Sequence, residues 1–300
     1  MAVADNFGIA LRRRTHAKQA TQEQHVPRPL VSIITATTGK PALEKCLLSV
    51  MHQTYRPIQH VMFVDGPCCK EQADATLAAF AHRSAAMPAG AADGYELARV
   101  DLPFSVGRDR WNGHRIYGAG SYLADGEYAM FLDDDNQLEP THVSDCMAVI
   151  DAGHDWAYSL RRLVNADGHD LGFDDCESLG KWPSVLHPED YFIDVNCYFL
   201  KRAVAIAASP IWFRKAREPG QMEVDRVLRK VLGERLFPRF ECTYRYTVVY
   251  TVGSNRMSVQ PEFFARGNAE MLRRYNGILP WKRAADTVRA DGAHLLSSTG

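Results

Sequence analysis

Three adjacent acids, Asp133, Asp134 and Asp135, follow a short apolar run at residues 128–132. A run of this length and composition is typical of a buried strand. Adjacent carboxylates repel one another and are costly to bury, but a divalent cation placed among them removes much of that cost. Open α/β sheets bind ligands at the carboxyl ends of their strands, which is where these acids fall. The alternative is a solvated turn before a helix that starts near Pro140, with Asp or Asn as its cap.

Polar residues also stand at the ends of two other predicted strands. Thr35, Ala36 and Thr37 close a β-branched run at 30–36, and Asp65 follows an apolar run at 60–64. Taken singly, Thr37 is more often a helix cap and Asp65 a turn acid. Parallel strands end at one edge of a sheet, so together with the three acids these residues predict a site for a nucleoside diphosphate with a bound metal.

A basic stretch at residues 107–115 precedes a predicted helix at 112–123. Arg108 and Arg115 could present guanidinium groups, beside a helix N-terminus, to a pyrophosphate. A solvated basic loop is the alternative. Three glycines within the predicted helix indicate close packing against the sheet or a ligand.

The elements that must position these residues alternate in type. Strands are predicted at 30–36, 60–64, 95–101 and 128–132, and helices from Pro41 to residue 51 and at 68–82, 112–123 and 141–152. Short connections between alternating strands and helices require parallel pairing, so residues 29–152 are predicted to form a Rossmann-like, nucleotide-binding half. No GxGxxG follows the first strand, which argues against a dinucleotide cofactor.

The second half, residues 153–300, has a different pattern. Strands are predicted at 156–164, 169–173, 191–200 and 244–252, and helices at 201–208, 221–232, 263–275 and 281–289. Residues 1–28 are predicted to be a flexible arm with a short helix around 7–18. With no internal repeat and no clear linker, the sequence predicts a single α/β domain with a mixed central sheet.

Composition narrows the classes of partner. The 300 residues are 46% hydrophobic and 24% charged with a net charge of -1, which argues against nucleic acid or an anionic membrane as the main partner.

No signal peptide and no apolar stretch of about 18–20 residues is present, so we expect a soluble, cytoplasmic protein and leave loose membrane association open. Seven cysteines without CxxC spacing predict free thiols in a reducing cytosol.

Three motifs make residues 30–145 resemble family-2 glycosyltransferases of the GT-A fold. Val-Ser-Ile-Ile-Thr-Ala-Thr-Thr-Gly-Lys, at residues 31–40, leads to a helix that ends in Gln-Thr-Tyr at 53–55. Phe-Val-Asp-Gly-Pro follows at 63–67, and Gly-Glu-Tyr-Ala-Met-Phe-Leu-Asp-Asp-Asp at 126–135. The resemblance implies a GT-A-type domain that consists of a nucleotide-sugar-binding half and an acceptor-binding half.

The resemblance also implies roles for single residues. Thr37 and Asp65 match positions that contact the nucleoside. Thr35 and Ala36, beside Thr37, are included in the predicted donor site. Asp133 and Asp135 match the Asp-x-Asp motif, with Asp135 the better ligand for Mn²⁺ or Mg²⁺. Asp134 is the variable position and could touch the ribose or the donor sugar. Ala36 stands where the family has proline, and Val64 replaces the first acid of its Asp-Asp-Gly pattern. These departures leave the nucleotide base open, with UDP as the default.

The family places its catalytic base in a Glu-Asp pair at the start of a helix in the second half. The nearest match here is at residues 221–228, where Glu223 and Asp225 are separated by one residue. Asp225 precedes a helical apolar pattern and is the first choice, with Glu223 second. The alternative is an ordinary acid at a helix N-terminus. The acid pairs at 174–175 and 189–190 are rivals.

These residues predict a metal-dependent, inverting transfer of a sugar from a nucleotide-sugar donor to an acceptor hydroxyl. A sugar nucleotidyltransferase is the second enzyme candidate, although 37–40 is a poor version of its Gly-rich loop. A catalytically inactive nucleotide- or sugar-binding module is the non-enzyme candidate, supported by the altered Glu-x-Asp spacing. No histidine is assigned as a metal ligand. Trp156 and Trp182 could stack on a sugar ring, although core packing is the more usual use of tryptophan.

Overall fold

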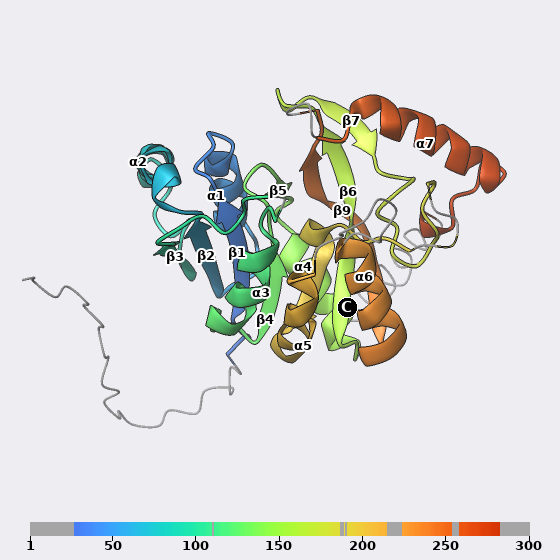
Figure 1. Ribbon diagram of the computed structural model, residues 1–300, viewed down its shortest axis with the longest axis horizontal. Coiled ribbons are helices and arrows are strands. Elements are labelled where there is room, and N and C mark those ends of the chain that lie inside the picture. The colour runs from blue at the N-terminus through green and yellow to red at the C-terminus, as the bar shows by residue number, and fades with distance from the viewer. Residues whose placement is uncertain are drawn as a thin grey trace, which may run out of the picture.

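One mixed sheet organises the chain in the computed structural model, which describes residues 27–109, 111–186, 189, 191–214, 224–253 and 258–282. Its strands follow the order β3-β2-β1-β4-β8-β6-β9-β5, and β7 pairs with β6. Figure 1 shows β3, β2, β1 and β4 side by side in this order. Nearly all of the predicted arm at 1–28, including its short helix, and most of the predicted helix at 281–289 lie outside the described residues.

Four parallel strands build the first half, as predicted. β1 (Val31–Thr37) lies between β2 (Ile58–Val64) and β4 (Tyr128–Phe131), and β3 (Tyr95–Asp101) lies outside β2. All residues of β2 are buried, because helices cover both faces of the sheet there. The Rossmann-like half inferred from the alternation of strands and helices is therefore confirmed.

Helices pack on both faces of this parallel region. α1 (Leu43–Met51) and α2 (Lys70–Ala85), which follows a 3-10 turn at Pro67–Cys69, form one apolar cluster with β2. α3 (His114–Leu123) packs against β1 and α5 (Arg202–Trp212). A Cβ at Gly120 would lie 2.8 Å from Ile34, and one at Gly118 would lie 2.7 Å from Phe213. The glycines of this helix therefore serve close packing, as expected.

The second half joins the sheet through an antiparallel strand. β8 (Tyr198–Lys201) pairs with β4 on one side and with β6 (Trp156–Val164) on the other, antiparallel to both. β6 then pairs in parallel with β9 (Phe240–Thr251) and antiparallel with β7 (Asp170–Phe173). α4 (His142–Asp151) ends the first half and packs against β6 and β9. The helices of the second half are α5 (Arg202–Trp212), α6 (Val224–Val231), which continues as a π-helical turn at Leu232–Leu236, and α7 (Pro261–Arg274).

The predicted strand at 191–200 is wrong over most of its length. Only Tyr198–Lys201 is extended in the sheet, after a 3-10 turn at Val195–Cys197 that Asp194 caps by accepting a hydrogen bond from the backbone N–H of Asn196. A capping acid within an apolar run competes with strand pairing, and apolarity alone does not reveal it. The two-residue β5 (Gln137–Leu138), paired with β9, was also not predicted.

Trp156 and Trp182, the two candidates for stacking on a sugar ring, pack against other aromatic rings. Trp156 is fully buried and stacks on Phe240 with 4.1 Å between ring centroids. Trp182 is partly buried against the core, and its ring lies 5.5 Å from that of Trp281. All seven cysteines are free thiols. Within the described ranges, no helix combines the length and the apolar character that crossing a membrane requires.

Candidate functional site

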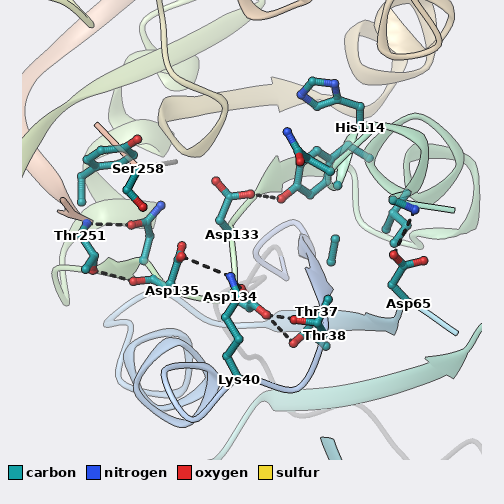
Figure 2. Close-up of a pocket in the computed structure, with 18 residues that line it drawn as sticks. Thr37, Thr38, Lys40, Asp65, His114, Asp133, Asp134, Asp135, Thr251 and Ser258 are labelled. Carbon is teal, nitrogen blue, oxygen red and sulfur yellow. Dashed lines mark hydrogen bonds and ion pairs between the residues drawn. The ribbon is translucent and has the colours of Figure 1, made fainter. Parts of the chain in front are cut away.

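A cleft of about 790 Å³ opens at the carboxyl ends of β1, β2 and β4 (Figure 2). Parallel strands end at one edge, so residues distant in sequence meet there. The predicted site residues Ala36, Thr37, Asp65 and Asp133 to Asp135 are all in its walls. The full lining is Ala36, Thr37, Thr38, Lys40, Asp65, Gly107, Asn112, Gly113, His114, Ile116, Tyr117, Asp133, Asp134, Asp135, Asn136, Tyr250, Thr251 and Ser258.

Asp134 fastens the loop after β1 to the end of β4. The register of these strands pairs Ile34 with Phe131, and three residues further along each chain Thr37 meets Asp134. The Thr37 hydroxyl donates to Oδ2 of Asp134 at 2.7 Å, and the backbone N–H of Thr38 donates to the same oxygen at 3.2 Å. Only 7% of the Asp134 side chain is exposed, so its carboxylate is largely occupied by the protein itself.

Lys40 faces the acids from the same loop. Its Nζ lies 3.3 Å from Oδ1 of Asp134 and 3.4 Å from Oδ2 of Asp135, and half of the side chain is exposed. Burial raises the pKa of Asp135, while the positive charge of Lys40 opposes that rise. The sequence predicted only a turn at Lys40. A lone lysine in a turn carries no pattern that would have identified it.

Asp133 is held by one donor at each carboxylate oxygen. The Tyr117 hydroxyl donates to Oδ1, and the Asn196 amide donates to Oδ2 at 2.9 Å. Burial raises the pKa of Asp133 to about 7, and the charges of Asp135 and Asp194 add to that rise. The cost of burying this charge explains why a nearby cation would be favoured.

Asp65 shapes one wall of the cleft. Its carboxylate accepts hydrogen bonds from the backbone N–H groups of Val106, at 2.6 Å, and Gly107, at 3.0 Å, and from the Ser105 hydroxyl at 3.0 Å. A Cβ at Gly107 would lie 2.6 Å from Oδ2 of Asp65, so the close approach requires glycine. Thr35, by contrast, points into the core, where its hydroxyl lies 2.9 Å from Nε2 of His60.

Neither predicted arginine is among the residues that line the cleft. Arg115 lies over the Trp111 ring, 4.0 Å from its centroid, and its Nη1 donates to the Val106 carbonyl at 3.4 Å. Arg108 is exposed. Both flank the loop that Asp65 organises, and their contact with a diphosphate stays a prediction.

Asp225 lies in the first turn of α6 and is not among the described residues that line the cleft. Its Oδ1 is 3.9 Å from Nε2 of His114, which lines the cleft and packs on Trp212. Burial lowers the pKa of His114 to about 4, so this imidazole is neutral near pH 7. The sequence did not single out His114, because an isolated histidine carries no spacing signal. Glu223 lies outside the described residues.

The rival acids have other partners or lie away from the cleft. Asp174 is fully buried beside Arg161, with its Oδ2 2.6 Å from Nη2 of the guanidinium. Asp175 accepts from Nε1 of Trp281 at 2.9 Å and pairs with Lys282. Glu189 is exposed, and residue 190 is outside the described part of the chain.

The predicted metal site at this edge rests on two acids, Asp133 and Asp135. Among the residues that the structure describes, no three His, Cys, Asp or Glu side chains converge as a metal site. Asp133 and Asp135 both line the cleft. Two carboxylates suit a Mg²⁺-type ion, which takes its remaining ligands from water and substrate phosphates.

Comparison with solved structures identifies the fold. S. aureus TarS 1–349 in complex with UDP-GlcNAc matches with a TM-score of 0.52 and 15% identity over 78% of this chain. The chain spans 61% of the length of that TarS chain. The TarS structure with UDP matches at 0.53 and 14% identity, over 84% of this chain and 72% of TarS.

A mannosyltransferase from Pyrobaculum calidifontis in complex with GDP-Man and Mn²⁺ matches with a TM-score of 0.52 and 13% identity. The match covers 91% of this chain and 80% of that one. No protein-family model matches the sequence, and no curated protein matches it. The shared architecture shows that this chain has a GT-A-like glycosyltransferase fold.

Proposed function

We propose that this protein is an inverting glycosyltransferase of the family-2 type that moves a sugar from a nucleotide-sugar donor, a UDP-sugar by default, to an acceptor hydroxyl in the cytoplasm. The observation that carries the proposal is the cleft at the carboxyl ends of β1, β2 and β4, with Asp133 and Asp135 in its wall. Structures with the same fold have been solved with UDP-GlcNAc and GDP-Man.

The donor would lie along the edge of the parallel strands. Ala36, Thr37 and the wall shaped by Asp65 would face the nucleoside, whereas Thr35 would contribute only through its backbone because its hydroxyl is engaged in the core. Lys40 lines the cleft and would meet the diphosphate. Arg108, in the neighbouring loop, and Arg115, in the first turn of α3, are further candidates for this contact.

Asp135 and Asp133 would hold Mn²⁺ or Mg²⁺, and their two carboxylates fit an ion that keeps water and phosphate ligands. When bound, such an ion supplies positive charge to the departing diphosphate. Asp134 is not assigned to the metal, because its oxygens are bonded to Thr37, Thr38 and Lys40.

Asp225 is the proposed general base, with Glu223 as the second choice. The acceptor hydroxyl would donate its hydrogen to the Asp225 carboxylate while its oxygen forms a bond to the anomeric carbon. The bond from that carbon to the diphosphate oxygen breaks on the opposite face, so the configuration inverts. The proton remains on Asp225, and no protein nucleophile is required.

Calorimetry with UDP, with and without Mn²⁺, tests the proposal, followed by turnover assays on a panel of UDP- and GDP-sugars. The Asp135→Asn variant should lose at least tenfold in Mn²⁺-dependent UDP affinity, on the order of one charge-assisted interaction. Asp151→Asn, which changes an exposed acid on α4, is the matched control and should behave as wild type. Release of pyrophosphate from a nucleoside triphosphate would favour a nucleotidyltransferase, and binding without turnover would favour an inactive module.

A further inference from the structure

Asn196 meets Asp133 at the point where the two halves of the sheet join. The antiparallel register of β4 and β8 pairs Met130 with Phe199, and three residues beyond this pair Asp133 and Asn196 lie opposite each other. The Asp133 backbone N–H donates to Oδ1 of Asn196 at 2.7 Å, and Nδ2 of Asn196 donates to Oδ2 of Asp133 at 2.9 Å. Asn196 is fully buried, so one side chain holds both the backbone and the carboxylate of Asp133.

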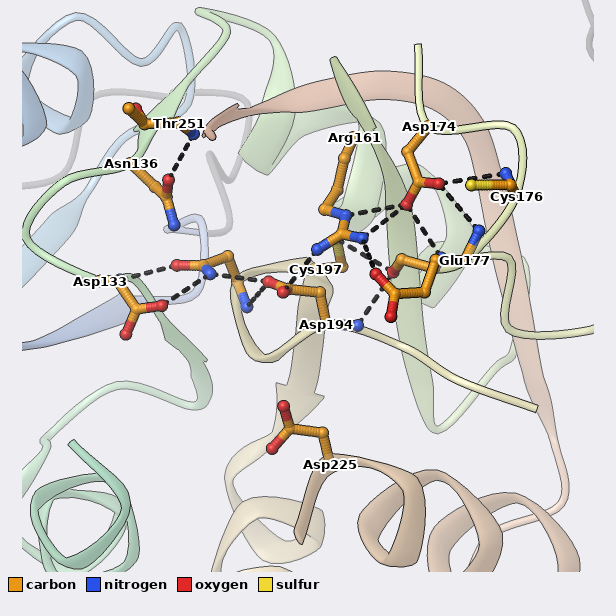
Figure 3. A network of polar contacts seen from close by, with 12 residues as sticks. Asp133, Asn136, Arg161, Asp174, Cys176, Glu177, Asp194, Cys197, Asp225 and Thr251 are labelled. Atoms are coloured by element: carbon orange, nitrogen blue, oxygen red, sulfur yellow. Dashed lines mark hydrogen bonds and ion pairs between the residues drawn. The ribbon is translucent and has the colours of Figure 1, made fainter. Parts of the chain in front are cut away.

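The same amide continues to a second carboxylate. Nδ2 of Asn196 also donates to Oδ1 of Asp194 at 2.7 Å, so both amide hydrogens and the amide oxygen are used. The orientation of the amide follows from chemistry, because only its NH₂ group can face two carboxylates. Asp194 in turn accepts from Nη1 of Arg161 at 2.7 Å (Figure 3).

Arg161 anchors this chain of contacts in the core. Its side chain is only 1% exposed, and its Nη2 donates to Asp174 at 2.6 Å and to Glu177 at 3.0 Å. The guanidinium carbon lies 4.3 Å from the centroid of the Tyr250 ring, which lines the cleft. A planar group with this many fixed partners has little freedom, so the position of Asp194 is also well defined.

We propose that Asn196 is a positioning residue for Asp133, and that Arg161, Asp194 and Asn196 together set the orientation of this acid from the acceptor half. The inference rests on the proposed function. With Tyr117 donating to Oδ1 and Asn196 to Oδ2, the carboxylate plane of Asp133 is fixed before any ligand arrives. Without the amide, the carboxylate can rotate, and the entropic cost of ordering it falls on ligand binding.

The test is the affinity for UDP of wild type and Asn196→Ala, measured by calorimetry with and without Mn²⁺. Positioning acts through Asp133, so the variant should lose about tenfold in affinity with Mn²⁺, the size expected for a hydrogen bond to a charged group. Its affinity without Mn²⁺ should change less than twofold. A purely structural role would lower both affinities by the same factor, and that result, or no change in either, would overturn the proposal.

Two further variants keep the test decisive. Ser159→Ala is the matched control, because Ser159 is also fully buried, on β6, and its hydroxyl has no hydrogen-bond partner among the described residues. It should leave both affinities unchanged. Asn196→Ser, with a small polar side chain, replaces the alanine variant if the latter does not fold, and should show the same split. Absence of Mn²⁺-dependent UDP binding by wild type would refute the proposed function and this inference with it, whereas binding that Asn196→Ala leaves intact refutes the inference alone.

Discussion

Lys40 and Asp135 face each other at the cleft with 3.4 Å between Nζ and Oδ2. The ammonium group of Lys40 therefore partly neutralises Asp135, and Lys40 and a bound metal ion would compete for this carboxylate. For Lys40→Gln we expect two- to fivefold tighter Mn²⁺ binding in the absence of nucleotide, the range of a partly exposed ion pair. Manganese titration followed by electron paramagnetic resonance measures this affinity.

Lys40→Arg is the control for that prediction, because it keeps the positive charge. Its Mn²⁺ affinity should stay near that of wild type. In the presence of Mn²⁺, Lys40→Gln should bind UDP more weakly than wild type, because a diphosphate contact is lost. Weaker binding of Mn²⁺ alone by Lys40→Gln would contradict the competition between lysine and metal.

Asp225→Asn should remove the proposed base without changing its volume. We expect kcat to fall by about 10²–10⁴-fold, the usual contribution of general base catalysis. The affinity for UDP with Mn²⁺ should change less than twofold, because Asp225 lies on α6 and is not among the described residues that line the cleft. Steady-state assays on the best nucleotide sugar, paired with calorimetry, measure both. Wild-type turnover by this variant would exclude Asp225 as the base.

Arg161→Met should destabilise the fold strongly. The substitution leaves Asp174, Asp194 and Glu177 without their buried cation, and removal of one partner from a buried ion pair costs about 3–5 kcal/mol. Urea unfolding followed by circular dichroism measures the loss. Arg273→Met, which breaks an exposed pair with Glu270, should leave the free energy of unfolding close to that of wild type. A similar cost for both variants would contradict the role of burial.

Two buried histidines, His60 and His142, should make the protein less stable in acid. Burial lowers the pKa of each to about 3, so each stays neutral in the folded state and takes up a proton on unfolding below about pH 6.5. Stability contributed by the neutral forms is complete above that pH and is lost as the pH falls toward 3. The pKa of Asp133 is raised in the folded state, so its contribution to stability is lost as the pH rises rather than as it falls.

The variant His142→Asn isolates the contribution of one histidine to the pH dependence of the free energy of unfolding. Proton uptake on unfolding near pH 5 should be about one proton smaller in this variant than in wild type, because the group that takes up that proton is missing. The slope of unfolding free energy against pH measures it. Replacement of the exposed His82 should leave the slope unchanged. An unchanged slope in His142→Asn would show that this imidazole is already charged in the folded protein.

Much of the parallel half could be predicted because local signals agree there. Apolar runs of strand length alternate with helical periodicity, and their polar ends at Thr37, Asp65 and Asp133 must then share one edge. The strand at 191–200 failed because the 3-10 turn capped by Asp194 interrupts an apolar run, and periodicity does not register a single capping hydrogen bond.

Residue type and periodicity are enough to predict the parallel strands, the edge at which they end and the acids at that edge. The contacts of the three acids could be identified only from the folded structure. Asp134 bonds to the loop after β1, Asp135 faces Lys40, and Asp133 is held by Tyr117 and Asn196. These partners lie between 16 and 97 positions away in the chain. Strand register brings Thr37 and Asn196 to the acids, and the packing of α3 on the sheet brings Tyr117.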